Sequence, residues 1–74
     1  MKGSLPMTTF SQANQVRIAL KMSLAKYSWY KSSIVNLLDD GYGVVVTVKS
    51  IDNNRRKLVP PLIDSVYIKI ESDN

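Results

Sequence analysis

The 74-residue chain contains no cysteine and no histidine, and only three glycines and three prolines. Without cysteine, disulfides and thiolate-ligated metals are excluded. Without histidine, the chain lacks the commonest metal ligand and the usual general base near neutral pH. Its serines therefore have no ordinary base to activate them as nucleophiles. We predict a protein that is not an enzyme, with no catalytic residues, no cofactor and no metal.

Long apolar runs and a strong charge of one sign are also missing. Ten basic and six acidic residues give a formal charge of +4, and so small and dispersed an excess does not by itself imply a nucleic-acid partner. No apolar run approaches the roughly 20 residues that span a bilayer. The N-terminus lacks the apolar segment of a secretory signal peptide. We expect a cytoplasmic protein that has no membrane partner.

The chain length allows one small domain. Met7, followed by two threonines, is typical of a native start, so residues 1–6 are expected to be a leader and residues 7–74 a single α+β domain. A domain of this size buries only about 60% of its unfolded surface. Since no disulfide or metal supports such a core, we expect a homo-oligomer, with a dimer favoured.

One amphipathic helix is predicted near the N-terminus. Thr8, Thr9 and Ser11 offer capping oxygens, and the chain from there to about Tyr27 lacks glycine and proline. Its main apolar stripe consists of Ala13, Val16, Leu20, Leu24 and Tyr27. A second apolar patch, Ile18, Met22 and Ala25, lies roughly opposite. Either neighbouring loops cover this patch or it makes a subunit contact.

A β-hairpin is predicted next. Ile34–Leu38 is a short apolar run that fits a strand or a helix extension, with the strand favoured. Asp39-Asp40-Gly41 is a turn signal. The two carboxylates could also serve in catalysis or metal binding, but the sequence nearby supplies no further ligands for such a site. The following strand carries Val44, Val46 and Val48 on one face, and Val45, Thr47 and Lys49 on the other. Gly41-Tyr42-Gly43 leads into a strand rather than a helix, which excludes a phosphate loop.

The C-terminal region is predicted to be a polar loop, Ser50–Lys57, a stiff Pro60-Pro61 step and a final strand. In that strand Val66, Ile68 and Ile70 alternate with Tyr67, Lys69 and Glu71. Together, the predicted helix and strands indicate a two-layer α+β domain (α-β-β-β), with one N-terminal helix packed on a small three-stranded, mainly antiparallel sheet. Two free edges and one open face favour dimer formation.

Two groups of residues are candidates for binding. Trp29 and Tyr30 either close the open end of the core or form a binding hot spot, together with the patch residues Ile18 and Met22. The basic residues Arg55, Arg56 and Lys57 form a solvated loop tip, or a contact for nucleic acid or an acidic protein. In the nucleic-acid alternative, Lys31 adds a cation and the nearby aromatic rings add stacking surfaces.

From Ala13 to Glu71 the chain resembles the small αβββ domains found beside trypsin-like serine peptidases in some bacteria. The residues that carry the resemblance are Pro60 or Pro61, Ile63, Asp64, Val66 and Ile68. Ser65 stands where those domains usually have glycine. The resemblance implies an accessory or interaction role, such as a component of a larger peptidase-associated assembly, and it carries over no catalytic residue.

These observations predict a non-enzymatic interaction or accessory domain that acts as a homo-oligomer. Its alternatives are a small nucleic-acid-binding protein that uses the basic loop, and a peptidase-associated component.

Overall fold

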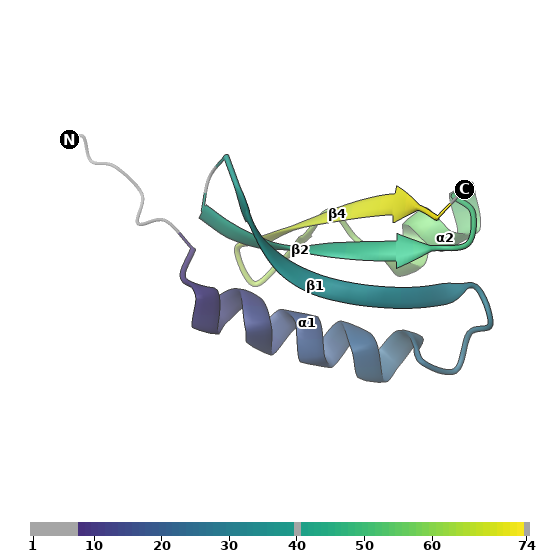
Figure 1. The fold of residues 1–74 in the computed structure, drawn as a ribbon, viewed down its shortest axis with the longest axis horizontal. Helices are drawn as coiled ribbons and strands as arrows, with labels where there is room; N and C mark the ends of the chain where they lie inside the picture. Colours follow the sequence, from purple (N-terminus) through teal and green to yellow (C-terminus); the bar gives the residue numbers. More distant parts are fainter. Residues whose placement is uncertain (1–7, 40, 74) are drawn as a thin grey trace.

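One long helix lies against one face of a mixed four-stranded sheet (Figure 1). The computed structural model describes residues 8–39 and 41–73, so the expected leader, Met7 and Asp40 of the predicted turn lie outside the described residues. The elements are α1 (Phe10–Leu24), β1 (Tyr30–Leu38), β2 (Gly41–Val48), α2 (Asn53–Leu58), β3 (Leu62–Ile63) and β4 (Val66–Ser72). The predicted small α+β architecture, a helix packed on a sheet, is confirmed.

Helix α1 begins at a capping box formed by Thr9 and Gln12. The Thr9 side chain accepts from the Gln12 amide at 3.2 Å, and the Gln12 side chain accepts from the Thr9 amide at 2.9 Å. Two of the amides that a helix start leaves without an internal partner are therefore satisfied. The helix ends at Leu24 rather than near Tyr27, and the predicted stripe faces the sheet with its buried members Ala13, Val16, Leu20 and Leu24.

Strand β2 lies at the centre of the molecule. Its residues Val44, Val46 and Val48 are fully buried beneath α1, as their alternation predicts. β1 pairs with β2 in the antiparallel sense from Tyr30↔Val48 to Leu38↔Gly41, which confirms the hairpin. The ambiguous run Ile34–Leu38 is thus part of a strand, and this strand begins earlier than expected, at Tyr30.

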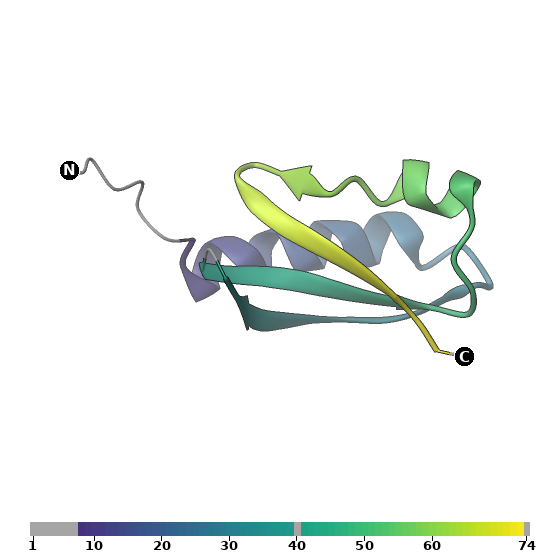
Figure 2. The ribbon, with the colours of Figure 1, turned by 90° about the horizontal axis from the view of Figure 1, so that it is seen from above.

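The predicted sheet needs two corrections, since it has four strands and its central pair, β2 and β4, is parallel. The register of that pair runs from Val44↔Ile68 to Val48↔Ser72. The cause lies in the segment predicted to be a loop, which contains α2. The Asp52 side chain accepts from the Arg55 amide at 2.8 Å and caps this helix. The chain then runs back along the sheet, so β4 enters in the same direction as β2 (Figure 2).

The short strand β3 and β4 are joined by a tight turn at Asp64 and Ser65. Both residues have positive φ, at 48° and 69° respectively, in the left-handed region that favours glycine. The turn lets Leu62 pair with Tyr67 and Ile63 with Val66. No helix within residues 8–39 and 41–73 is long and apolar enough to cross a membrane.

We predict that Ser65→Gly raises the free energy of unfolding by roughly 0.5–1 kcal/mol. The left-handed conformation costs an L-residue about 1–2 kcal/mol, and the greater chain entropy of glycine offsets part of the gain. Urea denaturation followed by Trp29 fluorescence measures the change. Ser65→Ala is the matched control, because it removes the hydroxyl and keeps the strain. If both variants lose stability equally, the serine side chain rather than its backbone conformation decides the turn.

Gly43 is required for a different reason, a close approach of backbone. A Cβ added at this position would lie 2.7 Å from the carbonyl oxygen of Tyr67 and would also contact the Leu38 side chain. We therefore predict that Gly43→Ala lowers the free energy of unfolding by about 1–3 kcal/mol. The exposed change Ser32→Ala in β1 is the control and should stay within about 0.5 kcal/mol of the native chain. An unchanged denaturation midpoint for Gly43→Ala would contradict this close packing.

Candidate functional site

Aromatic and cationic side chains meet at the end of the molecule where α1 ends and α2 begins. The rings of Tyr27 and Trp29 stack with their centroids 4.9 Å apart and their planes 18° apart. The Lys26 ammonium lies 5.3 Å from the Tyr27 centroid, and the Arg55 guanidinium carbon lies 5.4 Å from that of Trp29. Rings stacked this closely leave no room between them, so each cation lies on an outer ring face.

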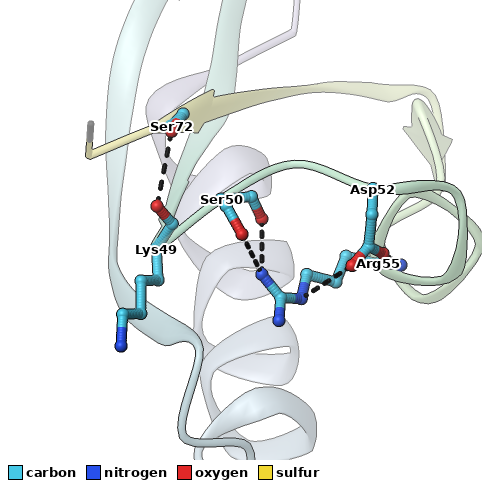
Figure 3. Close-up of polar contacts among 5 residues, drawn as sticks. All are labelled: Lys49, Ser50, Asp52, Arg55 and Ser72. Carbon is cyan, nitrogen blue, oxygen red and sulfur yellow. Dashed lines mark hydrogen bonds and ion pairs between the residues drawn. The ribbon is translucent and has the colours of Figure 1, made fainter.

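Arg55 is held in place by contacts within its own loop (Figure 3). Its Nη1 donates to the Ser50 carbonyl oxygen at 2.8 Å and to Ser50 Oγ at 2.5 Å. Its Nε lies 3.4 Å from Asp52 Oδ2, and Asp52 is also the cap of α2. The guanidinium therefore joins the loop, the start of α2 and the Trp29 ring, which is a structural use of this side chain.

The other predicted basic residues are exposed. Arg56 and Lys57 follow Arg55 on α2, while Lys31 lies in a β-bulge of β1, where the register shifts between Tyr30 and Ser32. A bulge and a lysine on an outer strand are features that hinder unwanted strand pairing. The predicted basic cluster thus divides into one side chain held by the fold and three that face solvent.

The four predicted interaction residues also divide into two pairs. Ile18 and Met22 lie one turn apart on α1 and are 43% and 77% exposed. Trp29 and Tyr30 are partly buried and pack against the core, and the Tyr30 hydroxyl lies 2.9 Å from Ser33 Oγ. The placement of the aromatic pair fits the interpretation in which they close the end of the core. The helix patch remains exposed.

The face of the sheet opposite α1 carries apolar side chains. Ile34 pairs with Val45 in the sheet register, and Val45 pairs with Lys69, so these three share that face. Val45 is only 4% exposed, whereas Ile34 and Tyr67 are 54% and 49% exposed. Sequence alternation predicted the outward position of Val45 and Tyr67, and the register adds Ile34 to the same surface.

The outer edge of β1 is a surface that the sequence interpretation did not single out. β1 is nine residues long and ends the strand order β1-β2-β4-β3. Within the described ranges no strand pairs with its outer edge, and Figure 2 shows β1 along one long side of the molecule. The Leu37 amide donates to the side chain of its neighbour Asn36 at 2.9 Å, so it points away from β2.

A groove between α1 and β3 is lined by Gln12, Gln15, Val16, Ala19, Ile63 and Asp64. Within residues 8–39 and 41–73, no three acidic side chains lie close enough together to hold a metal ion.

No protein-family model, curated protein or solved structure matches this chain. The resemblance to peptidase-associated αβββ domains therefore stays a prediction, and the function rests on the geometry alone.

We predict that Arg55→Met lowers the free energy of unfolding by about 1–2 kcal/mol, because it removes one cation–π contact and the hydrogen bonds to Ser50. It should also change the emission of Trp29, the one tryptophan in the sequence. The matched control is Arg56→Met on the exposed side of α2, which should stay within about 0.5 kcal/mol. Equal effects of the two variants would show that the contacts of Arg55 contribute no stability.

Proposed function

We propose that this chain is a non-enzymatic, cytoplasmic interaction or accessory domain that acts as a homo-oligomer, with a dimer favoured. The observation that carries the proposal is the open edge of β1, where Ile34 and Leu37 are 54% and 60% exposed. An exposed, long strand with apolar side chains is a template for pairing with another chain. The bulge and Lys31 shield only the first residues of this edge, whereas the segment Ile34–Leu38 carries no charge and no register shift.

The position of the core on one side of the sheet supports the same proposal. α1 covers only one face of the sheet, and the opposite face exposes Ile34 and Tyr67. A chain of this size gains little from further internal burial, so contact with another surface adds stability that the monomer lacks. The exposed helix residues Ile18 and Met22 offer a second, smaller contact surface.

The nucleic-acid alternative has less support. Single-strand binding needs free aromatic faces on which bases stack and free cations that contact phosphates. Here Tyr27 and Trp29 stack on each other with a cation on each outer face, and Arg55 is held by Ser50 and Asp52. The remaining candidates are the exposed cations Lys31, Arg56 and Lys57. The peptidase-associated alternative depends on the sequence resemblance only.

We predict that the chain sediments at equilibrium, at tens of micromolar, with about twice its monomer mass of 8.3 kDa. Apolar contacts should keep the dimer intact at high salt, whereas nucleic-acid binding through phosphates would weaken steeply with salt. A monomer at all concentrations would refute the homo-oligomer. Salt-sensitive binding of a single-stranded oligonucleotide that is lost on joint Arg56→Gln and Lys57→Gln substitution would favour the alternative.

A further inference from the structure

The segment Ile34–Leu38 of β1 has a symmetric pattern. In Ile34-Val35-Asn36-Leu37-Leu38, two apolar residues precede Asn36 and two follow it. A two-fold contact requires a surface that is complementary to itself, in which residue i meets residue j and j meets i. A strand whose apolar residues are symmetric about one position meets this requirement when it pairs antiparallel with its own copy.

The sheet register assigns these side chains to faces. Val35 and Leu37 are opposite Val44 and Tyr42, on the α1 face. Ile34, Asn36 and Leu38 lie on the other face, because successive residues of a strand alternate. In a continuous antiparallel sheet, residues that lie opposite each other must point to the same face. This condition is met only when the two-fold axis passes through a residue position, which leaves a small number of registers.

We propose that a second copy of this chain pairs with β1 edge to edge and antiparallel, about a two-fold axis at Asn36. The proposal rests on the homo-oligomer proposed above and specifies its interface. Ile34 of each copy lies opposite Leu38 of the other on the open face. Val35 of each copy lies opposite Leu37 of the other on the α1 face. The two sheets then form one continuous sheet, with both α1 helices on the same side.

The backbone of β1 is suited to this register. The Leu37 amide points away from β2, because it donates to the Asn36 side chain. Alternate residues share a direction, so the Val35 amide points outward as well. Pairing replaces the bond from the Leu37 amide to the Asn36 side chain. Once that amide is released, Val35 and Leu37 of the other copy can exchange both hydrogen bonds. The two Asn36 residues become a non-hydrogen-bonded pair, with Cα atoms about 4.5 Å apart.

The neighbouring registers fit less well. An axis at Leu37 places Asn36 opposite Leu38 and Val35 opposite Asp39, so apolar residues meet polar ones. An axis at Val35 places Ile34 opposite Asn36 and Leu37 opposite Ser33, so apolar residues meet polar ones. An axis at Ile34 places Leu37 opposite Lys31. Parallel pairing in register would bring Lys31 beside its own copy, where like charges repel. With the axis at Asn36, the two Lys31 residues are ten positions apart along the strands, roughly 33 Å.

The first experiment uses a property of the sequence, since the chain has no cysteine. Asn36→Cys places two thiols at a separation that a disulfide can bridge. We expect Asn36→Cys to form a covalent dimer within minutes in a glutathione redox buffer, at least tenfold faster than Ile34→Cys or Leu38→Cys alone. An equimolar mixture of Ile34→Cys and Leu38→Cys should form the mixed disulfide. Oxidation in urea should be equally slow for all variants.

The second experiment introduces a charged side chain at the proposed β1 interface. Leu37→Lys, at an exposed position of β1, is expected to weaken the dimer at least tenfold in sedimentation. Met22→Lys, at an exposed position of α1, is the matched control and should leave it unchanged. Circular dichroism checks that both variants are folded.

The outcomes separate this interface from the proposed function. A native chain that is monomeric throughout would overturn both. A dimer in which Ile34→Cys cross-links by itself, or in which Met22→Lys rather than Leu37→Lys produces monomers, would overturn the Asn36 register alone. The second of these results would place the contact on the Ile18 and Met22 patch of α1.

Discussion

Burial of the β2 valines beneath α1 is the interaction on which the rest of the structure depends. Val44, Val46 and Val48 are fully buried, and the capped helix holds Val16, Leu20 and Leu24 against them. β2 also has a strand on each side, β1 and β4. Because one strand carries the core and both neighbours, the main outward surfaces of the sheet and α1 are the edge of β1, the far face of the sheet and the back of α1.

Much of this fold could be predicted from periodicity. The apolar stripe of α1 and the alternating valines of β2 each have one face that must be buried, and both are where the sequence placed them. Strand direction could not be predicted, since alternation in Val66, Ile68 and Ile70 is the same in parallel and antiparallel pairs. α2 was missed because polar residues such as Asn53 and Asn54 are typical of loops, although Asp52 supplied a cap.

The candidate surfaces were predicted only in part. Ile18 and Met22 were placed opposite the buried stripe of α1, with cover by neighbouring loops left open. In the structure both side chains are exposed, so the loops do not cover them. The different environments of Arg55 and Arg56 could not be predicted, because they depend on the helical geometry of a segment that was expected to be a loop. The edge position of β1 depends on the strand order, which sequence does not specify.

The parallel pairing of β2 and β4 has a consequence for folding kinetics. α1, β1 and β2 contact one another through short connections, whereas β2 and β4 are joined through a connection that includes α2 and β3. Closing a longer loop costs more entropy before its contacts form. β4 is therefore expected to join last, and until it does the hairpin has two open edges. During that interval β2, the most apolar strand of the chain, is the segment most exposed to aggregation.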